Sequence, residues 1–441
     1  MSNEPKTKNN LEALIQAYRN LQLLPLLTDE ELRKFYVPYG ERTIAELQQV
    51  IEDCSDVNNK IIFTGHRGCG KSTLLGQLKR RLDDHFFVVF FSVAELIEMS
   101  DVNHVNILFA IALQMMEEAN RKAIAIKDST RESIEQWFAK RTRTEIETPL
   151  KAEVSAGFNL FDVIKGKLQS DATIRNEIKQ EFEPQISQLI DHLNTIAIVI
   201  EAAAQQEIVI IIDDIDKLDL SVVRDIFYDH VKTLFRPQFR IVFTIPIAAL
   251  REIPLRRTLE TETNNQINSM EVSKLYPKPD PNNRQQTLSP KQETIDLFTR
   301  ILEKRIDSSL IKPESIEQII LKSGGVLREF IRFASKCCSE CLVQIRLEPE
   351  RTDIIINQEI LEQALTAIRN DFDTPLSKPH YDILKTIYNT LTSDHETSED
   401  EQRFLDLLHG LYILEYRNAD LWYDLHPIAF DLLTRRGYLL P

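Results

Sequence analysis

Residues 60–78 read KIIFTGHRGCGKSTLLGQL, and this stretch decides the fold. Its first residues are mostly apolar and β-branched, which predicts a buried strand over residues 60–65. Gly65, Gly68 and Gly70 then allow the backbone to turn tightly. The leucines that follow have helical spacing. The predicted order is therefore strand, glycine-rich turn and helix.

The glycine-rich turn fits the pattern G-x-x-x-x-G-K-[ST], in which backbone N–H groups curl inward and cradle phosphate oxygens. The helix that starts at Gly70 adds the positive end of its dipole. Lys71 is expected to reach the β- and γ-phosphates, and the Ser72 hydroxyl to bind Mg²⁺. His66 and Arg67 flank the phosphates and are expected to contribute donors. The predicted nucleotide-binding residues are Gly65, His66, Arg67, Gly68, Cys69, Gly70, Lys71, Ser72 and Thr73.

A second motif supplies carboxylates. Residues 208–214 read IVIIIDD, a buried strand that ends in Asp213 and Asp214. We expect Asp213 to hold the metal ion beside Ser72, directly or through water, and Asp214 to polarise the attacking water. Asp216 is expected to cap the following helix or to pair with a neighbour. The two motifs together predict that the chain binds and hydrolyses ATP with magnesium, with Lys71 and Asp214 among the catalytic residues.

Three further strands complete an α/β sheet. Apolar runs predict strands at residues 86–91 and 241–245, and a shorter fifth strand near residues 270–275. Helical patterns separate all five, which predicts a mostly parallel sheet with helices on its faces. The gap at residues 93–207 is long. Its helical spacing predicts a helical insertion, in which Pro184 kinks or divides a helix.

The chain is long enough for several domains, because 441 residues exceed one ordinary core. Residues 1–55 are predicted to be an N-terminal helical segment, with two amphipathic helices around an extended piece. The predicted domains after it are a P-loop domain at 56–276, a proline-rich linker at 277–290, an all-helical lid at 291–372 and a winged helix at 375–441. The winged-helix prediction rests on a helix, helix, hairpin order, with the hairpin turn at residues 417–420.

The composition is that of a soluble globular protein, with 43% hydrophobic and 27% charged residues. No run approaches the roughly 18 consecutive apolar residues of a membrane helix, and the N-terminus lacks the apolar segment of a secretory signal. Five cysteines without a paired framework suit a reducing compartment, so we expect a cytoplasmic protein with no membrane partner. The net charge of −15 disfavours a dedicated nucleic-acid binder.

With these two motifs the chain resembles the P-loop ATPases of the AAA+ and STAND classes. It is nearest to the origin-recognition-like and signal-transduction branches that end in a winged helix. The resemblance implies that Thr244, at the end of the fourth strand, senses the γ-phosphate. It also implies that Arg328, in the sequence GGVLR at residues 324–328, reaches back from the lid to the nucleotide. Many relatives carry Glu where Asp214 stands, so slow hydrolysis is expected.

Other basic residues and the cysteines have two interpretations each. Relatives present an arginine finger to a neighbouring subunit after the fourth strand, where this chain has Arg251, Arg256 and Arg257. An exposed basic loop explains these arginines equally well. Arg328 could also be an ordinary solvated arginine. Cys69 could be a redox-sensitive residue, although a small side chain that fits the loop is simpler. The cysteines of the lid lack partners at zinc spacing and are expected to be buried. The residues concerned are Arg251, Arg256, Arg257, Cys337, Cys338 and Cys341.

We do not expect the tail at residues 375–441 to bind DNA in the ordinary way, because it carries six basic and eleven acidic side chains. Its would-be recognition helix has Glu399, Asp400, Glu401 and Asp406 against a single Arg403. The resemblance implies that this module instead packs on the nucleotide domain and locks the ADP state. The leading hypothesis is a nucleotide-operated ATPase switch that self-associates or binds a protein partner, with a role in stress or phage defence. The alternatives are a DNA-linked AAA+ ATPase and an ATP-binding scaffold with negligible hydrolysis.

Overall fold

The computed structural model describes residues 4–439, except residues 55, 57, 145–159, 285–287, 350, 352–353, 374–375, 396 and 418–419. The chain forms two compact units. The sheet unit comprises Glu41–Thr64 and Leu74–Ser269. The lid unit comprises Met1–Gly40, Gly65–Thr73 and Met270–Pro441, so the glycine-rich loop belongs to the same unit as the C-terminal half. No described helix is both long enough and apolar enough to cross a bilayer.

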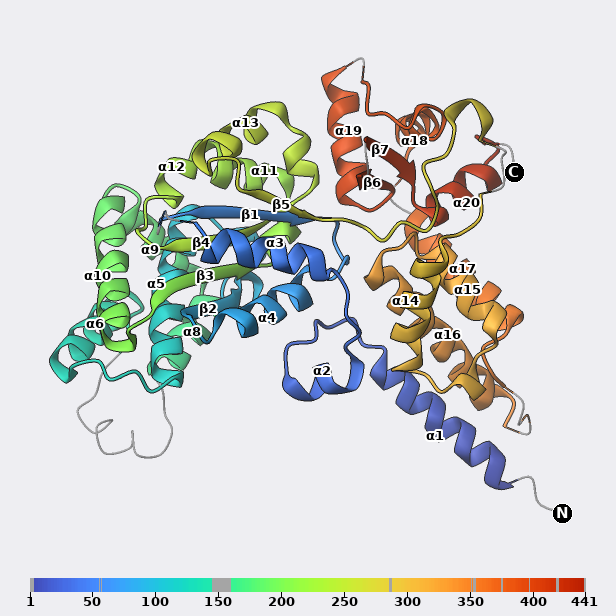
Figure 1. Ribbon diagram of the computed structural model, residues 1–441, viewed down its shortest axis with the longest axis horizontal. Coiled ribbons are helices and arrows are strands. Elements are labelled where there is room, and N and C mark those ends of the chain that lie inside the picture. The colour runs from blue at the N-terminus through green and yellow to red at the C-terminus, as the bar shows by residue number, and fades with distance from the viewer. Residues whose placement is uncertain are drawn as a thin grey trace. The chain divides into compact units, whose positions relative to one another are not determined.

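The sheet unit is built on five strands in the order β2-β3-β4-β1-β5 (Figure 1). Their bounds are β1 (Lys60–Gly65), β2 (Phe86–Ser92), β3 (Glu207–Asp213), β4 (Arg240–Pro246) and β5 (Ile267–Met270). β2 pairs in parallel with β3, and β3 with β4. The predictions for the first four strands and for a mostly parallel sheet are confirmed. Each of these strands is an apolar run that is buried along most of its length.

The fifth strand begins about three residues earlier than predicted, over Ile267–Met270 instead of near residues 270–275. The prediction was wrong because it followed the apolar residues Val272 and Leu275. Both are buried, but in hydrophobic cores of the lid unit and not in the sheet. Val272 packs with Val326 and Trp422, and Leu275 belongs to the core of the lid helices. The actual strand is polar at its centre, as a short edge strand is allowed to be.

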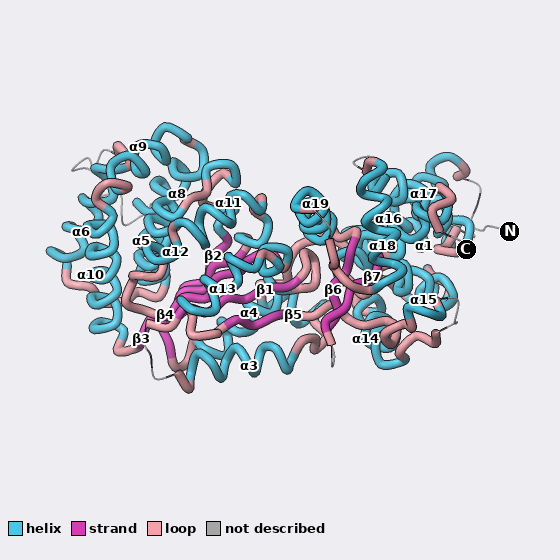
Figure 2. Tube along the Cα trace, turned by 90° about the horizontal axis from the view of Figure 1, so that it is seen from above, coloured by secondary structure: helices cyan, strands magenta, loops and turns pink. Residues whose placement is uncertain are grey.

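Helices surround the strands of the sheet unit (Figure 2). They are α3 (Glu41–Glu52), α4 (Lys71–Leu82), α5 (His104–Arg121), α6 (Asp128–Arg141), α8 (Leu160–Ser170), α9 (Ala172–Phe182), α10 (Ile186–Ala204), α11 (Leu220–Arg224), α12 (Val231–Leu234) and α13 (Ile253–Glu262). Short segments of other helical type are η1 (Val93–Glu95), η2 (Met99–Asp101), η4 (Ile215–Lys217), η5 (Asp225–Asp229) and η6 (Ala248–Arg251). The last residue of α9 and the first of α10 lie on either side of Pro184, as predicted.

The predicted helical insertion consists of α5 to α10, with residues 145–159 outside the described part. Its helices share an aromatic core. Phe138 meets the rings of Phe109 and Phe161 edge-on, at centroid distances of 5.4 and 5.6 Å. Such rings bury large apolar areas in a favourable relative orientation. The insertion is thus a packed part of the sheet unit with an aromatic core of its own.

The lid unit begins with α1 (Glu4–Asn20) and α2 (Asp29–Phe35), so residues 4–52 form three helices and not the two that were predicted. The missed break follows α1, and α2 starts at a capping box. There the Thr28 hydroxyl accepts from the Glu31 N–H, and the Glu31 carboxylate accepts from the Thr28 N–H. Leu14, Ala17 and Leu21 at the end of α1 are buried in the same core as the lid helices.

The lid helices are α14 (Gln292–Glu303), α15 (Pro313–Lys322), α16 (Leu327–Leu347) and α17 (Gln358–Asp373). The short segments η7 (Pro281–Asn283) and η8 (Ser308–Leu310) precede α14 and α15. Cys337, Cys338 and Cys341 on α16 are fully buried, as predicted for structural cysteines. Burial raises the pKa of the Cys338 and Cys341 thiols to about 12, so both stay protonated and unreactive.

The tail contains α18 (Lys378–Thr390), α19 (Ser398–His409), the antiparallel pair β6 (Ile413–Arg417) and β7 (Leu421–Leu425), and α20 (Pro427–Arg435). The predicted helix, helix, hairpin order is therefore present, and the turn residues 418–419 lie outside the described part. Ile428 and Leu432 of α20 are buried in the core of the lid helices. Asp431 accepts hydrogen bonds from Lys322 (2.8 Å) and Arg369 (3.0 Å). The tail is thus attached to the lid by both apolar and charged contacts.

Burial of His426 makes the stability of this attachment depend on pH. His426 caps α20 and is completely buried beside the Phe372 ring, and burial lowers its pKa to about 3. In the unfolded chain its pKa is about 6.5. Between pH 6.5 and pH 3 the unfolded state therefore binds the extra proton, so stability falls as pH falls. From pH 7.5 to 5.5, His426 is expected to lower the free energy of unfolding by about 1 kcal/mol.

Denaturant unfolding at these two pH values checks this expectation. His426→Gln should lose less stability on acidification than the wild type, because glutamine does not titrate in this range. His85→Gln, which changes an exposed histidine of the sheet unit, should behave as the wild type. An equal pH response in His426→Gln and the wild type would contradict the expectation.

Candidate functional site

The glycine-rich loop has the backbone conformation that its sequence requires. Gly68 has φ of +80°, in the left-handed region that favours glycine. A Cβ atom at Gly68 would lie 2.5 Å from the Cβ of Arg328, so any side chain there would collide with α16. At Gly65, with φ of +152°, a Cβ would lie 2.6 Å from the carbonyl oxygen of Met270. Both glycines therefore allow close packing of the loop within the lid unit.

Lys71 is held against the backbone of this loop. Its ammonium group donates to the carbonyl oxygens of Gly65 (2.9 Å) and His66 (2.8 Å), and the residue is only 4% exposed. Ser72 and Thr73 follow at the start of α4 and are half-buried. The Thr73 hydroxyl accepts from the N–H of Leu26, at 3.0 Å. The positive charge therefore already lies inside the loop, at the place where the motif predicts phosphate contacts.

Two arginines border the loop. The N–H of Arg328 donates to the carbonyl oxygen of Gly68 at 2.8 Å, which fixes the start of α16 against the loop. Among the described residues, the guanidinium groups of Arg67 and Arg328 have no hydrogen-bond or ion-pair partner. Arg332, one turn further along α16, is different, because it pairs with Glu329 (2.6 Å). Arg67 and Arg328 are thus available for an anionic ligand.

The tail contacts the loop through His66. The Nε2 atom of His66 accepts a hydrogen bond from the Glu415 N–H, at 2.8 Å, and His66 is 1% exposed. Because Nε2 is the acceptor, the imidazole is not protonated at this atom. Glu415 lies in β6, so the hairpin of the tail is bonded directly to the loop. No sequence pattern indicates this contact, which joins residues 349 positions apart.

Tyr39 is another neighbour of the loop that sequence reasoning missed. Its ring lies 3.5 Å from the place of a Cβ at Gly70, and its hydroxyl accepts from Ser273 at 3.3 Å. Burial raises the pKa of this phenol, so it is neutral. Its position in the extended piece between α2 and α3 was recognised, but nothing in that piece indicated a contact with the loop.

The sheet unit carries a group of three carboxylates at the end of β3. One oxygen each of Asp213, Asp214 and Asp216 lies within 4.8 Å of the others. Asp213 and Asp216 are 3% and 5% exposed. The N-cap of α11 is Asp219, so of the two alternatives predicted for Asp216 the cap is excluded and the pairing with a neighbour remains. Asp216 lies in η4, which turns it back towards the other two acids.

Three carboxylates this close repel one another unless a cation lies among them. Oxygen donors are the ligands that Mg²⁺ prefers, so the group fits a magnesium ion chemically. Asp214 already has partners. It accepts from the Ser92 hydroxyl at 2.6 Å and forms an ion pair with Lys217 at 2.5 Å. To polarise a water molecule, Asp214 would first have to release one of these contacts.

Thr244 lies near the end of β4 and is fully buried. Its hydroxyl donates to the carbonyl oxygen of Ile212, at 3.1 Å, so it bridges β4 to the residue before Asp213. Thr64 makes a similar bridge from β1 to β4 through the carbonyl oxygen of Ile245, at 2.9 Å. Thr244 is thus close to the acidic group at the end of β3. Its hydroxyl is hydrogen-bonded to the backbone of β3 and not to an acidic side chain.

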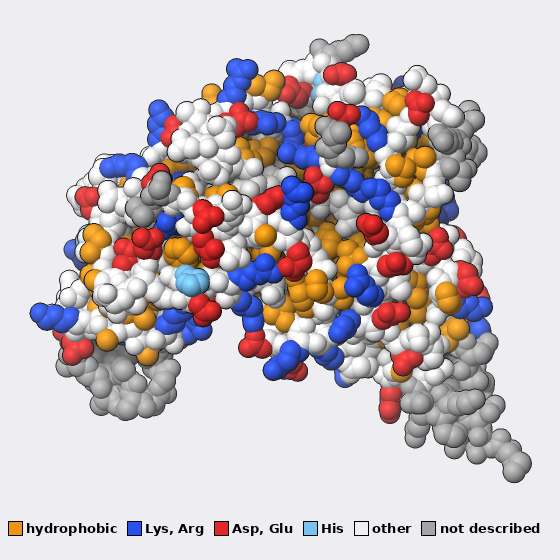
Figure 3. All heavy atoms as spheres, in the orientation of Figure 1, with side chains coloured by type: hydrophobic (Ala, Val, Ile, Leu, Met, Phe, Trp, Pro, Cys, Tyr) orange, Lys and Arg blue, Asp and Glu red, His pale blue; other side chains and the backbone are white. Residues whose placement is uncertain are grey.

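The three arginines after β4 differ in exposure. Arg251 is half-buried in η6, whereas Arg256 and Arg257 are exposed on α13. Arg256 is paired with Glu260, at 2.7 Å. On the face of the sheet unit drawn in Figure 3, basic and acidic side chains are interspersed. Arg256 and Arg257 on α13 are therefore more accessible than Arg251.

The comparison with protein families finds one match, the AAA ATPase domain, over residues 37–224. This range contains both the glycine-rich loop and the acidic group, and it ends before Thr244 and Arg328. A comparison with curated proteins gives no match.

Solved structures with a similar arrangement include Cdc6p from Pyrobaculum aerophilum, with 11% identity, coverage of 93% of this chain and 98% of that chain, and a TM-score of 0.40. The Aeropyrum pernix ORC2 protein has 11% identity, coverage of 96% and 98%, and a TM-score of 0.42. The Thermotoga maritima RuvB Holliday junction branch migration motor has 13% identity, coverage of 95% and 100%, and a TM-score of 0.39. These values are too low to transfer a function. Residues 37–224 are thus similar to the AAA ATPase domain, and both motifs lie within this range.

Proposed function

We propose that this chain is a magnesium-dependent ATPase that works as a nucleotide-operated switch, in which the tail regulates the phosphate loop. The observation that carries the proposal is the position of that loop within the lid unit. Gly68 is bonded to Arg328 of the lid, and His66 is bonded to Glu415 of the tail. The loop that is expected to bind nucleotide is therefore tied to the two elements that are expected to respond to it.

In this proposal the phosphates of ATP are bound by the loop residues 65–73. Lys71 leaves the carbonyl oxygens of Gly65 and His66 to meet the β- and γ-phosphates, and Arg67 adds a second positive charge. Ser72 and Asp213 hold Mg²⁺, which supplies charge neutralisation when bound. Asp214 orients the water, and Thr244 and Arg328 sense the γ-phosphate.

The switch follows from the contacts of His66. When phosphate binds, Lys71 no longer donates to the loop carbonyl oxygens, and one of these belongs to His66. A change at His66 in turn affects its bond to the Glu415 N–H in β6. A ligand can shift such an equilibrium only through contacts that differ between two states, and we propose that this bond is one of them. We infer that ADP favours the state with the tail bound and ATP the state with the tail released, as in STAND ATPases.

The tail is read as a winged helix that packs on protein and does not grip DNA. Arg403, the basic residue of α19, is paired with Glu399 and Asp400, at 2.9 Å each. A phosphate backbone would have to break these pairs and would meet further acids on the same helix. We infer that the partners are ATP, ADP and another protein or a second copy of the chain, for which Arg257 is a candidate contact.

Loosening the tail by one substitution tests the proposal. Asp431→Asn removes the negative charge that pairs with Lys322 and Arg369, which are only 25% and 9% exposed, without touching the loop. Breaking such a pair destabilises by about 3 kcal/mol, so release of fluorescent ADP should become at least about tenfold faster, since a tenfold change needs only about 1.4 kcal/mol. Deletion of the tail is less informative, because it would uncover the core around Ile428 and Leu432.

The matched control is Asp382→Asn, which changes an exposed carboxylate on α18 of the same tail. Its ADP release should equal that of the wild type. Unchanged release in Asp431→Asn, at a temperature where the protein is folded but its melting point is lowered, would contradict the regulatory role. Tight binding of duplex DNA at physiological salt, weakened by Arg403→Ala, would favour the DNA-linked alternative instead.

A further inference from the structure

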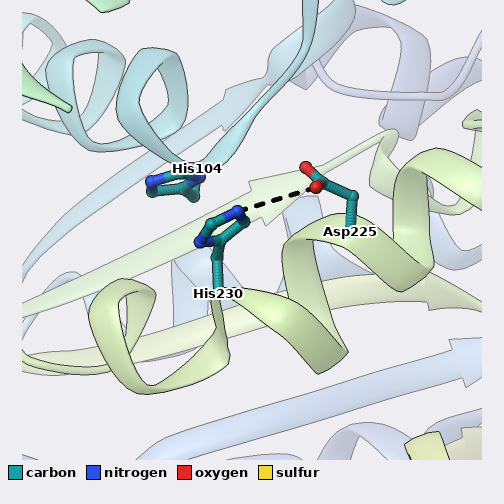
Figure 4. A group of neighbouring side chains, drawn as sticks. All are labelled: His104, Asp225 and His230. Atoms are coloured by element: carbon teal, nitrogen blue, oxygen red, sulfur yellow. Dashed lines mark ion pairs between the residues drawn. The ribbon is translucent and has the colours of Figure 1, made fainter.

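Two histidines and an aspartate meet on the sheet unit and form a group separate from that of the acids at the end of β3. Figure 4 shows these three side chains. His104 is the first residue of α5, Asp225 the first of η5, and His230 follows η5 directly. The two imidazole rings stack, with centroids 3.9 Å apart and an angle of 20° between their planes. The Nε2 atom of His230 lies 3.6 Å from a carboxylate oxygen of Asp225.

The backbone places these residues together in two ways. η5 is a π-helical turn, and the His230 N–H donates to the carbonyl oxygen of Asp225 at 3.1 Å. This wide turn brings residues five apart onto one side, whereas an α-helical turn of about 3.6 residues would separate them. On the other element, the side chain of Asn103 accepts from the N–H groups of Val105 and Asn106, at 3.1 Å each. This cap fixes the first turn of α5, and with it His104.

An ordinary ion pair accounts for Asp225 and His230 but not for His104. His104 is only 4% exposed, and its Nδ1 atom is buried without a hydrogen-bond partner among the described residues. A buried polar atom without a protein partner calls for a water molecule or an ion beside it, and here two further metal-binding side chains lie within reach.

We propose that His104, Asp225 and His230 bind a divalent transition metal ion, with zinc as the best match. One donor atom from each residue lies within 4.8 Å of the others. Two imidazole nitrogens and one carboxylate oxygen are a donor set for zinc and its neighbours in the first transition row. Magnesium and calcium prefer oxygen donors alone, so this site differs in chemistry from the acidic group at the end of β3.

Binding requires His230 to turn out of the ring stack and the donor atoms to move closer, because a metal ion lies in the plane of each imidazole ring that it binds. Zinc–nitrogen distances are about 2.0–2.1 Å, which places the donor atoms of a tetrahedral site about 3.3 Å apart. His230 and Asp225 can supply this movement, because their side chains are 37% and 53% exposed. His104 is fixed by burial and by the cap of α5. Solvent at the exposed side completes the fourth position.

The metal would join two segments that follow neighbouring strands. α5 comes after β2, and η5 comes after β3, whose end carries Asp213. α12, which begins after His230, also packs on α5. An ion held between them would stabilise this packing, because ligands that bind only the folded state raise its stability. Zinc should therefore raise the melting temperature of the chelator-treated protein.

Zinc titration of the full-length, nucleotide-free protein tests the site. The protein is first treated with chelator, and zinc is then titrated in competition with a chromophoric chelator in the presence of excess Mg²⁺. We expect one ion to bind per chain with a dissociation constant below about 1 μM. His230→Asn and Asp225→Asn should each weaken this binding at least about tenfold, as loss of a metal ligand does. Cobalt should give a ligand-field absorption band that disappears in both variants.

The chain offers matched controls for both substitutions. Asp229→Asn changes an exposed carboxylate at the other end of η5, and His85→Asn changes an exposed histidine of the same unit. Both should bind zinc as the wild type does. Because His230 and Asp225 are partly exposed, all four variants should melt alike in the presence of chelator. Zinc binding that His230→Asn and Asp225→Asn leave unchanged, including binding by the cysteines, would overturn the proposal, as would the absence of zinc binding by the wild type.

Discussion

Replacing Lys71 by alanine is expected to lower ATP turnover by at least about 100-fold, because one preorganised positive charge at the transferred phosphate accounts for an effect of this size. Lys71 is the ammonium group that lies inside the loop, bonded to the carbonyl oxygens of Gly65 and His66. Steady-state release of phosphate at saturating Mg-ATP measures the effect. ATP affinity should fall as well, since the same charge contacts the β-phosphate.

The control for this experiment is Lys232→Ala, which removes an exposed lysine of α12. Its turnover should equal that of the wild type. Circular dichroism should show that Lys71→Ala remains folded, because the lysine contributes charge and not core packing. Normal turnover by a folded Lys71→Ala protein would show that the glycine-rich loop is not the site of ATP chemistry.

Asp213→Asn and Asp214→Asn are expected to affect different steps. Asp214→Asn should keep ATP affinity within about twofold and lower turnover by about 100-fold, because the group that orients water loses its charge. Asp213→Asn should instead raise the Mg²⁺ concentration needed for half-maximal turnover, since a carboxylate is lost from the metal shell. Nucleotide binding and turnover measured over a range of Mg²⁺ concentrations distinguish the two.

The partners of Asp214 allow a sharper test. Ser92→Ala removes the hydroxyl that donates to Asp214 at 2.6 Å and leaves the carboxylate in place. Its turnover should not fall to the level of Asp214→Asn. Asp219→Asn, an exposed acid in the same loop, is the matched control for both substitutions. If Asp214→Asn turned ATP over as fast as Asp219→Asn, the water-orienting role would have to be given up.

Sequence alone predicted the parts of this molecule that depend on local pattern. Four strands were placed correctly because each is an apolar run with sharp polar ends. The loop was recognised from the spacing of its glycines. The structure shows why Gly68 is needed, because a Cβ atom there would collide with Arg328. The fifth strand was misplaced because burial of Val272 and Leu275 has a different cause, packing in the lid unit.

Contacts between residues far apart in the chain could not be predicted in this way. Nothing in the sequence around His66 indicates that Glu415 bonds to it. The donor is a backbone N–H, which every residue type except proline has. The grouping of His104 with Asp225 and His230 depends on a π-helical turn, for which there is no reliable sequence pattern.

Direct measurement of nucleotide binding and hydrolysis tests the central claim most closely. The purified full-length protein is titrated with ATP and with ADP, with and without Mg²⁺, and released phosphate is quantified in the same samples. We expect one nucleotide to bind per chain, phosphate release to require Mg²⁺, and both binding and release to be lost in Lys71→Ala. Absence of nucleotide binding by the wild type, or Mg²⁺-independent phosphate release that survives in Lys71→Ala, would contradict it.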